Sequence, residues 1–127
     1  MHEIEVQEHA VSIGKLNMNK YPTISFARNN TNGAFYATLN RVAGKLFPTK
    51  RIRVKVTTNY IIFEQSTDRR DFKLTGESDC TAYRLAISAA RNLGLEGKRF
   101  QMFRVKDKPN TYAINRNEPI HIKECLK

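Results

Sequence analysis

The feature that most constrains the fold of this chain is a weak internal repeat. Phe35 aligns with Tyr83, 48 residues later, and at the same offset the basic step at residues 50–52 aligns with residues 98–100. The order of expected elements also repeats, because each half reads as a strand, a polar turn, an amphipathic helix, a basic strand, a turn and a final strand. A chain with this pattern can fold as two related halves packed together.

The repeat predicts an α+β fold in which two related strand-helix-hairpin halves form one small barrel-like sheet with two short helices. The halves cover about residues 20–66 and 70–116 of a single domain spanning residues 1–127. A domain of this size buries enough surface to fold without a disulfide or a metal, and a closed sheet leaves no exposed strand edge. Chance similarity between two such units stays open as an alternative.

Hydrophobic periodicity places the individual elements. Residues 35–47 and 82–93 carry apolar residues at helical spacing, and Pro48 and Gly94 follow as stop signals. Alternation and buried runs predict strands elsewhere, at residues 3–7, 23–28, 51–56, 60–63, 72–74, 100–105 and 111–114. Ile120 and Ile122 suggest one more short strand.

The charge balance is strongly basic, with 22 Lys and Arg against 12 Asp and Glu, a net charge of +10 and a pI near 9.9. Residues 9–63 contain no carboxylate at all. Such a field destabilises a folded chain unless a polyanion offsets it, so we expect nucleic acid as the partner. No basic amphipathic helix or long apolar stretch favours a membrane.

The two cysteines and the N-terminal residues indicate the compartment and the metal content that we expect. Cys80 and Cys125 are far apart and lie in no zinc or redox motif, so we expect reduced thiols and no metal. The N-terminal residues lack the basic start and apolar run of a signal peptide, which favours the cytoplasm.

The strongest candidate site is the strand at residues 51–56. Arg51, Arg53 and Lys55 alternate along it, so they form a row of cations about 6.5–7 Å apart on one face. We call this row the basic comb, and we expect it to neutralise successive phosphates, with Ile52, Val54 and Val56 in the core. Further candidate nucleic-acid contacts are Lys50, Arg41, Lys45, Arg84, Arg91, Lys98 and Arg99. On the two expected helices, an ordinary solvated face explains the basic residues equally well.

No catalytic residue or cofactor site is predicted, because no nucleophile, phosphate-loop or dinucleotide motif occurs. One enzyme interpretation stays open. Asp71 and Lys73 form an Asp-x-Lys pattern after Asp68 and Glu64, which is similar to part of a metal-dependent nuclease site. A pattern this short arises often by chance, so we expect these residues to be ordinary charged side chains at the edges of strands.

The repeated unit resembles the swapped-hairpin DNA-binding domains of the AbrB type, with residues 23–63 as the better copy and residues 72–114 as the second. The resemblance implies DNA contacts from basic residues on the sheet and loops. The turn at residues 47–50 departs from the family pattern, whereas residues 95–98 lie close to it. The small basic chain also looks like phage-encoded proteins.

The leading functional prediction is therefore duplex DNA binding through phosphates, with a role in transcription regulation. The alternative is a phage-type inhibitor or accessory factor that acts on a nucleic-acid enzyme or defence complex. A homodimer stays open, since the acidic residues 3–8 could pair with the basic face of a second copy.

Overall fold

The computed structural model describes residues 21–29, 31–76 and 82–120, which contain nine strands, one short α-helix and one 3-10 helix. The elements, in chain order, are β1 (Thr23–Arg28), β2 (Phe35–Asn40), α2 (Arg41–Gly44), β3 (Arg51–Val56), β4 (Tyr60–Ser66), β5 (Phe72–Thr75), β6 (Ala82–Ala86), η1 (Ser88–Leu93), β7 (Arg99–Gln101), β8 (Phe103–Arg104) and β9 (Thr111–Asn115).

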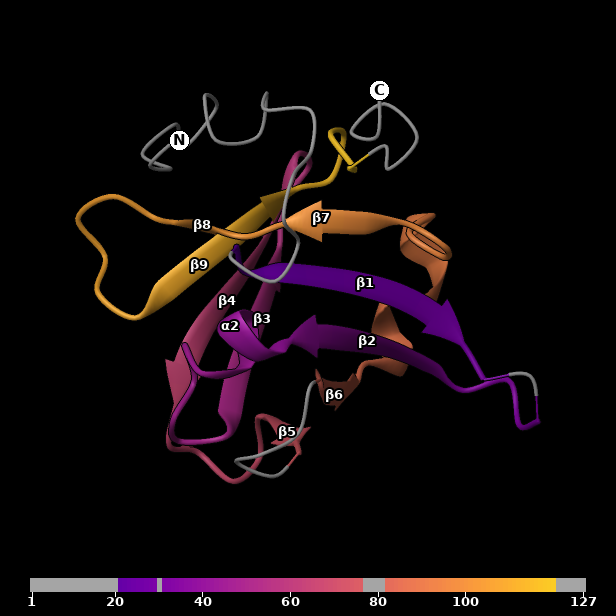
Figure 1. Ribbon diagram of the computed structural model, residues 1–127, viewed down its shortest axis with the longest axis horizontal. Helices are drawn as coiled ribbons and strands as arrows, with labels where there is room; N and C mark the ends of the chain where they lie inside the picture. The colour runs from indigo at the N-terminus through magenta and orange to yellow at the C-terminus, as the bar shows by residue number, and fades with distance from the viewer. Residues whose placement is uncertain (1–20, 30, 77–81, 121–127) are drawn as a thin grey trace.

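The strands form one antiparallel sheet in the order β7-β1-β2-β6-β5-β3-β4-β9-β8. The two ends of this order are adjacent in the chain, because only Met102 separates β7 from β8. The sheet therefore curls into a nearly closed barrel, seen in Figure 1 as strands wrapping around a common interior. The predicted barrel-like sheet is confirmed, whereas the α+β class is corrected to a mostly-β protein.

Several strand pairings of the two halves are equivalent in register, but the hairpins differ: Lys55 pairs with Ile62, whereas Phe103, at the repeat offset, pairs with Ala113. Arg51 pairs with Lys73 between β3 and β5, and the residues at the repeat offset, Arg99 and Ser25, pair between β7 and β1. The central β2–β6 pairing joins the halves, with Thr38 opposite Arg84. Equivalent positions thus have equivalent neighbours in the β1–β2 and β5–β6 pairs and in the β7–β1 and β3–β5 pairs, and a shared origin of the halves stays a prediction.

The first expected helix, residues 35–47, is wrong over its first half. Phe35, Ala37 and Leu39 are buried and the residues between them are partly exposed, so this segment is the strand β2. A spacing of four residues fits both the strand period and the helix period. The pairing of this segment with β1 and β6 makes it a strand, and the buried Ala37 fits the resulting alternation. The helix α2 is only one turn long and starts where the Asn40 side chain accepts a hydrogen bond from the Ala43 N–H.

The second expected helix, residues 82–93, divides in the same way. Its first part is the strand β6, with Tyr83 and Leu85 buried on one face, and its second part is the 3-10 helix η1. Gly94 ends η1 with a φ of 73°, in the left-handed region where glycine has no steric penalty. Both short helices lie at the points where a strand of the barrel leaves the sheet.

The remaining strand predictions agree with the structure at most positions. Residues 23–28, 51–56, 60–63, 72–74 and 111–114 lie in strands. The strand expected at residues 100–105 is interrupted at Met102, and Ile120 lies in no strand. The predicted strand at residues 3–7 and Ile122 lie outside the described residues.

The barrel interior is filled by apolar side chains from both halves. The ring of Phe26 lies 6.0 Å from that of Phe35 and 5.9 Å from that of Phe100, with the second pair edge to face. Phe47, which follows α2, packs edge to face on Tyr112 at 5.4 Å. This core holds the strands in place and turns their alternate residues outward, where the charged side chains lie.

Candidate nucleic-acid interface

The basic comb lies on β3, as expected, but its three cations have different surroundings. Arg51 is half-buried, and its guanidinium donates hydrogen bonds to the main-chain oxygens of Arg69 at 3.2 Å and Asp71 at 3.4 Å. On the opposite face Ile52 is buried, but the expectation that Val56 lies in the core is wrong, since it is 48% exposed.

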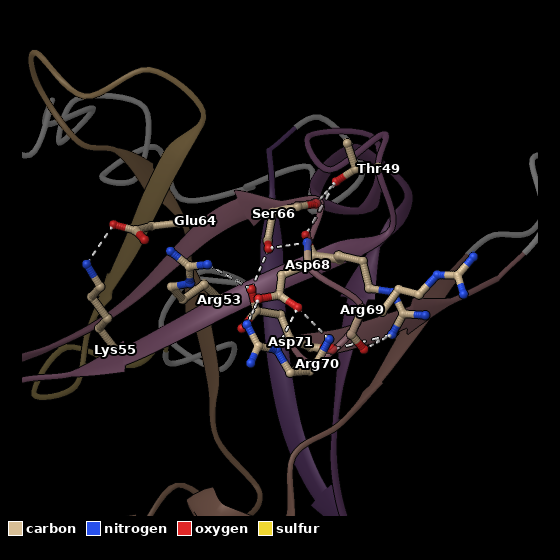
Figure 2. Close-up of polar contacts among 10 residues, drawn as sticks. Thr49, Arg53, Lys55, Glu64, Ser66, Asp68, Arg69, Arg70 and Asp71 are labelled. Carbon is tan, nitrogen blue, oxygen red and sulfur yellow. Dashed lines mark hydrogen bonds and ion pairs between the residues drawn. The ribbon is translucent and has the colours of Figure 1, made fainter.

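The other two cations of the comb are paired with carboxylates, as Figure 2 shows. Arg53 lies 3.3 Å from Asp71, and Lys55 lies 3.1 Å from Glu64, its diagonal neighbour on β4. The two cationic side chains are about half exposed, and exposed pairs of this kind contribute roughly 0–1 kcal/mol and are screened by salt. A phosphate could exchange with either carboxylate, but the comb carries less net charge than the sequence alone indicates.

The turn that follows β4 is held by its own hydrogen bonds. Asp71 accepts from the Ser66 hydroxyl, and the Asp68 carboxylate accepts from the Arg70 guanidinium at 3.0 and 3.2 Å. The hydrogen bonds from the Arg70 side chain and main chain lower the pKa of Asp68 below its usual 3.8. This turn projects Arg69 and Arg70 toward solvent (Figure 2).

The geometry gives no support to the nuclease interpretation. Among the described residues, no group of three Asp, Glu, His or Cys side chains is placed to hold a metal ion. Asp71 and Asp68 are each engaged by an arginine, and Glu64 is engaged by Lys55. These carboxylates therefore act as partners of the local cations in this arrangement.

A second set of cations lies on the outer face of the strands next to β3. Directly paired residues share a face of a sheet, so Lys73 on β5 lies beside Arg51 on the outside of the barrel. Arg84 on β6 lies between Thr75 of β5 and Thr38 of β2. Ser25 of β1 then lies between Thr38 and Arg99 of β7.

We define the cationic band as these outward side chains together: Arg51, Lys73, Arg84, Arg99, Ser25, Thr38 and Thr75. It crosses six consecutive strands of the sheet, from β7 to β3. Lys73 makes no ion pair with any described residue, and the Arg84 guanidinium lies 4.6 Å above the ring of Tyr36. That stacking fixes the orientation of the arginine without neutralising its charge.

The other predicted contact residues lie off this band. Lys50 donates to the main-chain oxygen of Gly76 at 2.9 Å and lies over the ring of Tyr83, so it is tied to the protein. Arg41 and Lys45 are exposed at the two ends of α2, and Arg91 is exposed on η1. The expectation that Arg84 and Arg91 lie on one helix, residues 82–93, is wrong, because Arg84 belongs to β6 and Arg91 to η1.

Lys98 precedes β7 in an exposed turn, next to Arg99. Lys73 and the hydroxyl residues Ser25, Thr38 and Thr75 are not among the contact residues that the sequence predicts. The alternation of polar and apolar residues predicts that each of them points outward from its strand, since each lies next to a buried residue. Their combination into one band depends on pairings between strands that are distant in sequence.

None of the described helices is long and apolar enough to cross a membrane. Comparison of the chain with family models, curated proteins and solved structures gives no match. The resemblance to AbrB-type domains therefore stays a prediction.

Proposed function

We propose that this protein binds duplex DNA through its phosphates, using the cationic band on the outside of the barrel. The observation that carries the proposal is the alignment of four cations and three hydroxyl residues across six neighbouring strands. Arg and Lys together with Ser and Thr are the side chains that make most protein–phosphate contacts. The excess of basic residues in the chain supports a polyanionic partner.

The spacing of the band also supports this proposal. Neighbouring strands lie about 4.8 Å apart, so along the curved sheet the strand of Arg84 is roughly 10 Å from that of Arg51 and roughly 14 Å from that of Arg99. These separations compare with the width of the major groove, about 12 Å. Cations on separate strands could therefore reach phosphates on both sides of a groove, with the hydroxyl side chains between them.

The test is fluorescence-anisotropy titration of a labelled duplex across a salt series, with the wild type and two double variants. Lys73→Ala, Arg84→Ala removes two cations of the band. Lys106→Ala, Lys108→Ala removes the same charge from the exposed loop between β8 and β9. If each band cation neutralises one phosphate, the slope of log K against log salt becomes shallower by about 1.8 in the band variant.

The loop variant is the matched control, and its slope should stay close to that of the wild type. Equal loss in both variants would mean that only total charge matters, which contradicts a role for the band. Weak, salt-independent binding of the wild type to duplex DNA would overturn the proposal. That result would favour the alternative, in which this protein acts on a nucleic-acid enzyme or a defence complex.

A further inference from the structure

One edge of β3 is left without a neighbouring strand. β4 pairs along the whole of β3, but β5 pairs only with Arg51 and Ile52. Main-chain groups of alternate residues face alternate neighbours in an antiparallel ladder, and the Leu74 N–H bonds the Lys50 oxygen at 2.9 Å. The even-numbered residues of β3 therefore face the β5 side, so the N–H and C=O groups of Val54 and Val56 point to an edge where no described strand pairs.

An apolar groove opens beside this edge. It has a volume of about 180 Å³ and is lined by Val54, Val56, Ile61, Phe72, Ile87, Ala90 and Leu93. An engineered apolar cavity of roughly 150 Å³ holds a benzene ring, so the groove has room for a branched aliphatic side chain. Val56, exposed by 48%, is the large hydrophobic residue that the described surface leaves most open.

The equivalent place in the other half of the barrel is covered. Met102 stands at the repeat offset from Val54, and its N–H donates to the main-chain oxygen of Pro22 at 2.9 Å. Its side chain is 2% exposed. At β7, the residue that leads into β1 extends the pairing by one more hydrogen bond beyond the Thr23–Gln101 pair. At β3, no described segment extends the pairing beyond Ile52. The groove thus has the geometry of a site for one more extended segment.

We propose that residues 3–8 of the same chain add to this edge of β3 as an extra strand. These residues, which lie outside the described part of the chain, read Glu-Ile-Glu-Val-Gln-Glu. On one face of such a strand Ile4 and Val6 would fill the groove, and on the other Glu3 and Glu5 would lie beside Arg53 and Lys55. When a strand adds to an open edge, its main chain forms the hydrogen bonds and its alternate side chains enter the pockets beside the edge.

Charge and chain length both favour this occupant. Arg53 and Lys55 lie on the outward face of β3 beside this edge, in half-exposed ion pairs that a neighbouring carboxylate can join. Arg91 is exposed on η1, and the groove lining contains no carboxylate. Residues 9–20 connect the segment to Tyr21, and twelve extended residues reach about 40 Å. That reach exceeds the diameter of about 36 Å expected for a compact domain of this size, and tethering gives a high effective concentration.

The test is amide hydrogen exchange of the full-length protein measured by NMR, without nucleic acid. The amides of Arg53 and Lys55 face β4 and report that the barrel is folded. The amides of Val54 and Val56 report on the open edge. In the wild type we expect all four to be protected, and in an Ile4→Glu, Val6→Glu variant we expect the Val54 and Val56 amides to exchange at least tenfold faster, with the other two unchanged.

A Val11→Glu, Ile13→Glu variant makes the same chemical change outside the segment, and it should leave all four amides protected. Fast exchange of Val54 and Val56 in the wild type, or the same rates in both variants, would overturn the proposal. Protection that falls when the protein is diluted tenfold would place the segment of another copy on the edge and would overturn the same-chain assignment. Because no nucleic acid is present, the result is independent of DNA binding.

Discussion

Replacing Gly44 with alanine separates what helix propensity predicts from what the packing dictates. Gly44 is buried in the short helix α2, where alanine is favoured over glycine by up to about 1 kcal/mol. Propensity alone therefore predicts that Gly44→Ala stabilises the protein. The structure predicts the opposite, because a Cβ at this position would lie 1.9 Å from the Cδ1 atom of Tyr83.

The size of the effect follows from the surroundings of that ring. Tyr83 is 4% exposed in the core cluster, and Lys50 lies over its ring, so the ring has little room to retreat. Overpacking a core costs about 1–3 kcal/mol, and so close a contact belongs near the upper limit. After subtracting the gain in propensity, we expect the free energy of unfolding to fall by about 2 kcal/mol.

Urea unfolding followed by circular dichroism measures this change. With an m value near 2 kcal/mol/M, the midpoint should fall by about 1 M. On a Tyr83→Leu background, which removes the ring, the same substitution should cost less than about 0.5 kcal/mol. A midpoint that is unchanged or higher for Gly44→Ala in the wild-type background would refute the packing argument and restore the propensity argument.

Two further predictions concern hydrogen bonds near the turns. Asn40 accepts from the N–H groups of Ala43 and Thr23 and donates to the Tyr21 oxygen, so Asn40→Ala should lower the free energy of unfolding by about 2 kcal/mol in urea, with Asn40→Asp costing less because it keeps the acceptor. A smaller loss for alanine than for aspartate would contradict this role. Arg70 lowers the pKa of Asp68, so the interaction stabilises the fold above the unfolded pKa and is lost as the pH falls through the lower folded pKa. Carboxyl NMR titration should show the Asp68 pKa rising toward 3.8 in Arg70→Ala, and an unchanged pKa would exclude the Arg70 side chain as the cause.

Some of this protein could be read directly from its residues. Arg51–Val56 alternates charged and apolar side chains so regularly that only a strand fits, and β3 has those bounds. Lys73 could be recognised as an outward strand residue by the same alternation. The repeat also predicted the barrel-like sheet, because local patterns fix which residues of a strand face inward and which face outward.

Other features depended on contacts between distant segments. Phe35 and Leu39 fit a helix or a strand equally well, and the pairing of β2 with β1 and β6 settles the choice. Local periodicity carries no information about which strands become neighbours, so the position of Lys73 beside Arg51 was beyond its reach.

The sequence by itself determined the strongly basic charge, the alternating strands and the repeated order of elements. Only the tertiary structure decided that Arg53 and Lys55 lie against Asp71 and Glu64, that Lys73 joins Arg51 on the outer face, and that β3 keeps an open edge beside an apolar groove. The physical reason is that periodicity is a property of neighbouring residues, whereas charge pairing and strand edges depend on which segments the barrel brings together.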